Sequence, residues 1–133
     1  MLSNQPTDFH ELVRPLPTSS GRRTALARWL TANDTPASAL IARVVVNRVW
    51  QHLTGVGIVP TSENLGMSGD RPVFPELLDR LAAEFVENDW RIKPLIKNIM
   101  LSSVYRQTSR DEVVTTSGRD PHDVDPENQL LWK

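Results

Sequence analysis

Six polar side chains stand where they could bind an anion or a carboxylate. Three interrupt an apolar run and three form one later block: Arg43, Asn47 and Arg48 in ALIARVVVNRVWQHLTG, and Tyr105, Arg106 and Gln107. Each guanidinium offers five N–H donors in a planar fork that matches carboxylate or sulfate oxygens. One hypothesis is therefore an anion pocket built from Arg43, Asn47, Arg48 and Arg106.

The same residues also suit a structural role, which we favour. Arg43 and Asn47 are one helical turn apart in a segment whose other side chains are mostly apolar. Buried polar groups need hydrogen-bonding partners. The second hypothesis is therefore a buried or half-buried polar network that ties this helix to residues 105–107. Its guanidinium groups would donate to helix carbonyls or to a carboxylate such as Glu84.

Other catalytic or metal-binding groupings are not apparent in the sequence. His52 has no second ligand residue three or four positions away, and the chain has no cysteine. Asp120, Asp123 and Asp125 lack the spacing and the glycine of a calcium loop. We therefore predict no catalytic residue, no metal site and no cofactor in this fragment.

Length and composition are those of one globular domain. The chain has 133 residues and a formal net charge of −1. Nucleic-acid-binding domains usually carry a basic excess, so we expect no nucleic-acid partner. No apolar run approaches the ~20 residues that cross a bilayer. The first residues lack the apolar region of a signal peptide.

Apolar spacing predicts an all-α fold, an orthogonal or irregular bundle of four main helices. The expected helices cover about residues 21–32, 38–53, 75–87 and 93–101, and the last can extend to residue 107. Glycines and prolines punctuate residues 56–74. We expect a long ordered loop there, between the second and third helices.

The predicted organisation has four parts. Residues 1–19 form an extended lead-in, 20–107 the helical core, 108–124 a flexible linker and 125–133 the start of a truncated further helix. Asp125 and Pro126 resemble the cap and first residue of that helix. Its apolar end, Leu130, Leu131 and Trp132, is expected to contact other domains of the same protein.

Several motifs resemble the domain of unknown function 1553, also named the planctomycete PSD-one domain. They are GRRTALARWLTAND, ARVVVNRVWQHLTG with GIVPT, FPELLDRLAAEFVENDWRIKPLIKNIMLSSVYRQTS, and DPENQLLW. Their order and spacing match over about residues 20–132. Two places depart from the family pattern: Leu53 stands near a glycine that an aromatic residue usually precedes, and Phe74 replaces a usual histidine.

The resemblance implies a context and no particular reaction. Family members are large exported proteins of planctomycetes and related bacteria, often with a c-type cytochrome domain, which implies a periplasmic or extracellular location. There the domain continues beyond the segment matching Trp132, so this chain looks like its N-terminal part. We interpret the chain as a non-catalytic structural or interaction module. The alternative is an Arg-lined anion or carbohydrate site in an enzyme acting on polysaccharide.

Overall fold

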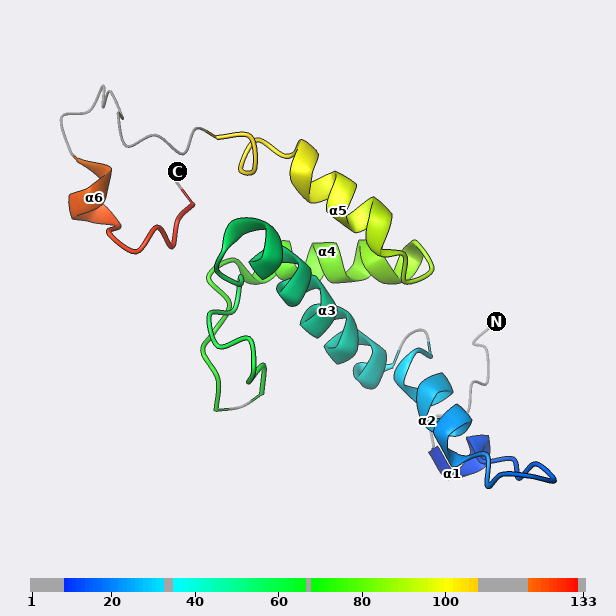
Figure 1. The fold of residues 1–133 in the computed structure, drawn as a ribbon. Helices are drawn as coiled ribbons and strands as arrows, with labels where there is room; N and C mark the ends of the chain where they lie inside the picture. The colour runs from blue at the N-terminus through cyan, green and yellow to red at the C-terminus, as the bar shows by residue number, and fades with distance from the viewer. Residues whose placement is uncertain (1–8, 33–34, 67, 108–119, 132–133) are drawn as a thin grey trace.

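The computed structural model describes residues 9–32, 35–66, 68–107 and 120–131. Apart from an isolated bridge between Leu16 and Ser19, the regular elements of these residues are all helices. They are α1 (Phe9–Leu12), α2 (Arg22–Leu30), α3 (Pro36–Thr54), α4 (Pro75–Glu87), α5 (Ile92–Leu101) and α6 (Pro121–Val124). Four of them, α2 to α5, have nine residues or more, which confirms the all-α fold of four main helices (Figure 1).

The longest helix, α3, starts two residues earlier than predicted. Thr35 caps it, because its Oγ1 accepts a hydrogen bond from Ser38 N at 3.2 Å. Pro36 takes the first helical position, where its missing N–H costs nothing. Gly55 ends the helix with a φ of 91°, a conformation that suits a residue without Cβ.

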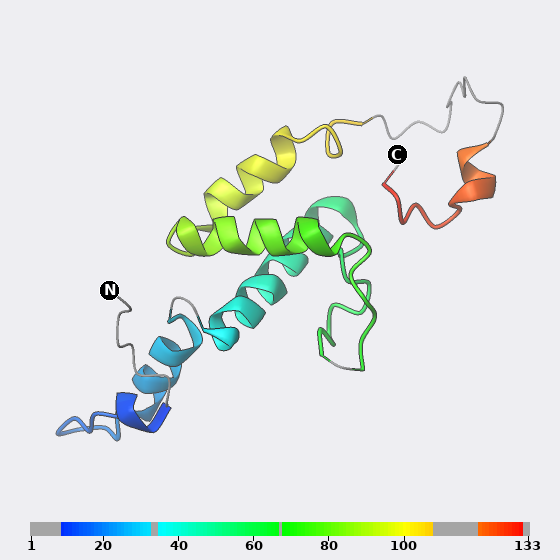
Figure 2. The same ribbon diagram turned by 180° about the vertical axis from the view of Figure 1, so that it is seen from behind.

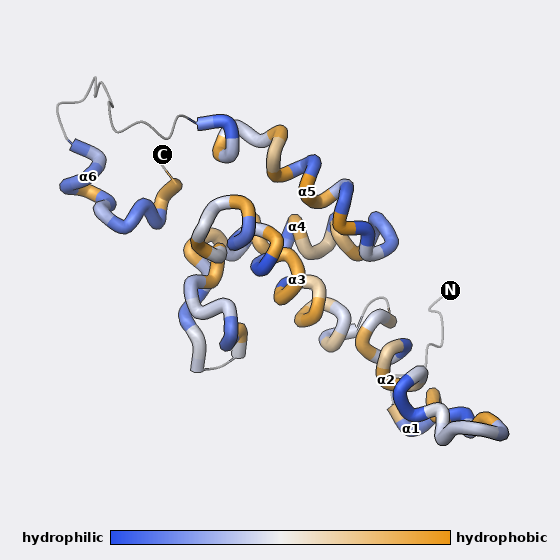
Figure 3. Tube along the Cα trace, in the orientation of Figure 1, coloured by the Kyte–Doolittle hydropathy of each residue, from blue (hydrophilic) through white to orange (hydrophobic). Residues whose placement is uncertain are grey.

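Helices α3, α4 and α5 pack on one another, while α1 and α2 extend from the N-terminal end of α3 (Figures 1 and 2). Apolar side chains of α3, α4, α5 and the loop after α3 form the core. Figure 3 shows hydrophobic residues along these elements. The buried members of the core include Val46, Trp50, Ile58, Val59, Leu78, Leu81, Phe85, Leu95 and Ile99. The rings of Phe85 and Trp90 meet edge to face, 5.4 Å apart. This core fixes the surfaces described below.

Helix α5 ends at Leu101 and does not extend to residue 107. Ser102 adopts an extended conformation with ψ of 155°, and its hydroxyl donates to Ile99 O at 2.6 Å. The hydroxyl oxygen then accepts from Tyr105 N at 3.3 Å. Side-chain bonds of this kind compete with the helical ladder, so turns replace the extension.

The predicted lead-in and linker each contain a short helix, α1 and α6. Residues 108–119 of the linker lie outside the described residues. Among the described segments, no helix combines the length and the hydropathy that a membrane crossing needs.

Residues 125–131 form turns in place of the predicted further helix. The Asp125 carboxylate is buried and accepts hydrogen bonds from Gln129 N at 2.9 Å and Leu130 N at 2.7 Å. Asn128 and Leu131 have positive φ values of 55° and 56°, which a helix excludes. Leu131 packs against the chain's own core, whereas Leu130 is 60% exposed. Trp132 lies outside the described residues.

Candidate functional site

Asn47 joins α3 to the loop of residues 56–74. Its side chain is fully buried, and all its described hydrogen bonds go to this loop. Nδ2 donates to Val59 O at 3.1 Å and to Ser62 Oγ at 3.2 Å, while Oδ1 accepts from Val59 N at 2.8 Å. One amide therefore satisfies both backbone groups of a buried residue. We call this set of contacts the Asn47 clamp.

Gly57 allows the loop to approach Asn47 this closely. A Cβ at position 57 would lie 2.6 Å from Val59 O and 2.8 Å from Asn47 Nδ2, well inside van der Waals contact. The base of the loop is closed by a bond from Val73 N to Ile58 O at 2.9 Å. Ile58 and Val59 are themselves core residues. The base of the loop thus belongs to the core.

A second set of bonds shapes the outer half of the loop. Thr61 Oγ1 accepts from Asp70 N at 2.8 Å and donates to Asn64 O at 3.3 Å. Asn64 Oδ1 accepts from Gly66 N at 3.3 Å. A Cβ on Gly69 would lie only 1.7 Å from Asn64 O, so the backbone turns tightly there. These contacts fix the shape of the outer loop from within.

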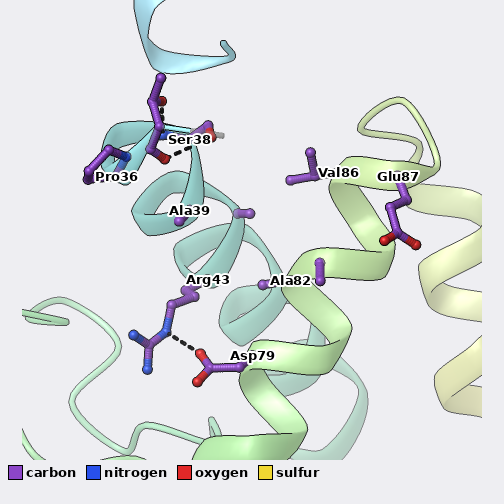
Figure 4. A pocket seen from close by; sticks show the side chains of 11 residues that line it. Pro36, Ser38, Ala39, Arg43, Asp79, Ala82, Val86 and Glu87 are labelled. Carbon is purple, nitrogen blue, oxygen red and sulfur yellow. Dashed lines mark hydrogen bonds and ion pairs between the residues drawn. The ribbon is translucent and has the colours of Figure 1, made fainter. Parts of the chain in front are cut away.

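Arg43, one turn before Asn47, faces α4 and the loop. Its Nε lies 3.2 Å from Asp79 Oδ1 (Figure 4). Although this Nε atom is buried, its direction does not make a hydrogen bond to that oxygen. The two side chains are 36% and 62% exposed, so solvent screens the ion pair. The pair therefore positions the guanidinium more than it stabilises the fold.

Two hollows meet at Arg43. An open groove of about 560 Å³ runs between α3 and α4 and is floored by small side chains such as Ala39, Ala82 and Val86 (Figure 4). A second hollow of about 320 Å³ lies between α3 and the loop. We call it the loop cleft; its lining includes Leu40, Arg43, Val59, Leu65, Asp70, Arg71 and Pro72.

The other four predicted site residues lie elsewhere. Arg48 is exposed on α3, and Tyr105, Arg106 and Gln107 are exposed in the turns after α5. Among the described residues, no hydrogen bond or ion pair joins any of them to Arg43 or Asn47. The structure therefore brings together Arg43, Asn47 and the loop, and leaves the remaining four residues apart from them.

The sequence suggested Glu84 as an acceptor for the guanidinium groups of the polar network, but its carboxylate has other partners. Its carboxylate accepts from Arg80 Nε at 2.9 Å and from Asn98 Nδ2 at 2.8 Å. Asn98 belongs to α5, so the carboxylate ties α4 to α5. Glu84 therefore makes a polar link between α4 and α5, whereas Arg43 and Asn47 are on α3.

Sequence reasoning missed Ser62, Gly57 and Arg71 as parts of the site. Ser62 completes the Asn47 clamp, Gly57 gives it room, and Arg71 lines the loop cleft beside Arg43. The signal was the glycine-rich character of residues 56–74, which marks close backbone approaches. Within the described segments, no three His, Asp or Glu side chains gather where they could hold a metal ion.

Comparison with known proteins gives one assignment. No curated protein and no solved structure matches the chain. Residues 22–133 match the family PSD1, described as a protein of unknown function (DUF1553). The matched span includes α2 to α6, the Asn47 clamp and the loop cleft. On this match over most of its length, the chain belongs to the PSD1 (DUF1553) family.

Proposed function

We propose that the chain is a helical interaction module that docks onto another part of a larger protein through the outer face of α5. The proposal rests on the apolar face of α5. This face is wider than the part that the neighbouring helices cover. Leu95 and Ile99 are buried at 5% and 2% exposure, but Ile92 and Met100 are 49% and 42% exposed.

The uncovered part of α5 forms a continuous stripe. Ile92, Ile96 and Met100 follow one another at intervals of four residues, so they lie along one helix face. Ile96 is partly buried. Covering the remaining exposed surface of these three side chains would contribute roughly 1 kcal/mol each. Such a stripe suits an apolar helix face as its partner.

Charge indicates the chemistry of that partner. Lys93 and Lys97 border the stripe, each one position after an isoleucine, and α5 has no acidic residue. A complementary helix would place Asp or Glu beside its own apolar stripe. We assign this helix to another segment of the same gene product. The larger protein is proposed to be exported and to carry a c-type cytochrome domain, in line with the family resemblance.

Thiol labelling tests the docking proposal, because these 133 residues have no cysteine and each introduced thiol can be followed in its own peptide. Met100→Cys places a thiol on the stripe, and Glu76→Cys places a control thiol on the exposed first turn of α4. Both should react rapidly with a maleimide in the isolated chain. In the full-length gene product, Met100→Cys should react at least about tenfold more slowly, since docking removes the stripe from water.

Two outcomes count against the proposal. Equal labelling of Met100→Cys in the isolated chain and in the full-length product means that nothing covers α5. If the labelling of Met100→Cys slows as the concentration of the isolated chain rises, a second copy of the chain covers the α5 stripe. The Glu76→Cys rate must stay constant in both proteins for the comparison to hold.

A further inference from the structure

We infer that the loop cleft binds a small ligand with one carboxylate and an apolar body. This site lies apart from the α5 face and goes beyond the docking function. The cleft has a volume of about 320 Å³, the size of a small-molecule site. Its ligand chemistry follows from Arg43, Arg71 and the apolar walls.

Arg43 is poised to bind a carboxylate. The Asp79 contact involves Nε and leaves the two terminal nitrogens on the side away from α4 (Figure 4). Among the described residues, these terminal nitrogens donate no hydrogen bond. Arg43 also lines the loop cleft. A guanidinium held at one edge can offer its other N–H groups to both oxygens of a carboxylate.

Arg71 supplies a second cation from the loop side. It is exposed, lines the same cleft and has no hydrogen bond or ion pair to a described residue. Arg43 is on α3 and Arg71 is on the loop, so a bound carboxylate would bridge two elements. The flexible end of Arg71 can close over the ligand without moving the backbone.

The remaining walls are apolar. Leu40 is 50% exposed on α3, and Leu65 and Pro72 face the cleft from the loop. Covering these side chains with an aliphatic or aromatic body would remove them from water. A bare inorganic anion would bind the two guanidinium groups but would leave this apolar surface exposed to water.

Charge on the rim limits the ligand to a single negative group. Asp70 lines the cleft, and Asp79 holds Arg43, so two acids balance the two arginines. A second negative group on the ligand would find no further arginine in the cleft to pair with and would approach Asp70.

The walls of the cleft are fixed before any ligand arrives. The Asn47 clamp holds Val59, which lines the cleft, and the Thr61 contacts hold the outer loop. A preformed cleft loses less conformational entropy when it binds a ligand. This favours measurable affinity for a ligand of modest size.

A matched pair of probes tests the inference in the unmodified chain. Cyclohexanecarboxylate carries the charge and the apolar ring, and cyclohexanecarboxamide has nearly the same shape without the charge. Titration followed by amide NMR should give saturable shifts at Gly66 and Gly69, with a dissociation constant of about 1 mM for the carboxylate. The carboxamide should bind roughly tenfold more weakly.

Variants assign the effect to the cleft. Arg43→Gln should weaken carboxylate binding roughly tenfold, and Arg71→Gln by roughly threefold, because each loses a charged donor. Arg48→Gln is the matched control, an exposed arginine on α3 that does not line the cleft. It should bind like the parent chain. Arg43→Lys keeps the charge without the planar fork and should fall between the parent and Arg43→Gln.

Three results would each overturn the inference: no saturable shift with the carboxylate, equal binding of the carboxamide, or full binding by Arg43→Gln. The probe comparison needs no substitution, so it stands even where a variant folds poorly. It is also independent of α5, since thiol labelling at Met100 reports the other surface.

Discussion

Replacing Asn47 by leucine should destabilise the chain by about 2–4 kcal/mol, because it leaves buried backbone groups without partners. Leucine has the same number and branching of side-chain heavy atoms, but its methyl groups cannot lie 2.8–3.1 Å from Val59 N and O as the amide does, so repacking adds to the cost. Val59 N–H would lose its acceptor, and Val59 O would keep only the longer contact from Ser62 Oγ at 3.5 Å. The free energy of unfolding of a native domain is about 5–15 kcal/mol, so this loss is a large share of the chain's stability.

Urea unfolding followed by tryptophan fluorescence, to which the buried Trp50 contributes, measures this loss. Hydrogen exchange of the Val59 amide reports the clamp itself, and its protection should fall far more than that of amides in α5. Ser62→Ala removes one partner only and should cost about 1 kcal/mol. An Asn47→Leu chain within 0.5 kcal/mol of the parent, with Val59 still protected, would refute the reasoning.

Asn47→Asp adds a pH test of the same geometry. Burial and the nearby Val59 carbonyl should raise the pKa of the introduced carboxyl above its unfolded value. A group with a raised folded pKa binds its proton more tightly when folded, so stability increases as pH falls through that pKa. The protonated carboxyl can also donate to Val59 O. This variant should therefore be more stable at acidic than at neutral pH, relative to the parent chain.

Four further substitutions test other parts of the structure. Gly57→Ala should cost about 1–3 kcal/mol, because its Cβ would lie 2.6 Å from Val59 O. Gly66→Ala, whose nearest neighbour is a side-chain oxygen at 3.3 Å, should change unfolding free energy by less than about 0.5 kcal/mol. Phe85→Ala should lower stability by about 3–5 kcal/mol in thermal or urea unfolding, since the ring is 3% exposed and packs on Trp90. Asp125→Ala should speed exchange of the Leu130 amide at least about tenfold while leaving α3 unchanged, because a charged acceptor is lost. Equal exchange in the two chains would show that the Asp125 carboxylate does not hold residues 125–131.

Helix positions could be predicted from the sequence because their signals are local. The apolar spacing of residues 75–87 and the proline at their start define α4, and Gly55 defines the end of α3. The turns at residues 125–131 were missed for a local reason too. Asp125 followed by Pro126 is typical of a helix start, but the carboxylate accepts from Gln129 and Leu130, too far along the chain for an N-cap.

The partners of the polar residues could not be predicted, because they are mostly backbone groups. The sequence marks Asn47 as an amide in an apolar helix that needs hydrogen bonds. Its main partners are the N–H and C=O of Val59, and every residue type but proline carries both groups. The path of the loop decides which backbone reaches Asn47. That path depends on packing of Ile58 and Val59 in the core, which no sequence periodicity records.

Substitutions at Asn47 and Arg43, one turn apart on α3, should affect stability and ligand binding differently. Asn47 is buried and hydrogen-bonded to the loop backbone. Its loss should therefore both lower stability and loosen a wall of the loop cleft. Arg43 is partly exposed and pairs with a solvent-screened acid, so Arg43→Gln should cost less than about 1 kcal/mol of unfolding free energy. A folded Arg43→Gln chain that loses carboxylate binding, beside an unstable Asn47→Leu chain that loses it too, is the pattern expected. Strong unfolding by Arg43→Gln would instead make Arg43 a scaffold residue and remove the reason to assign it a ligand.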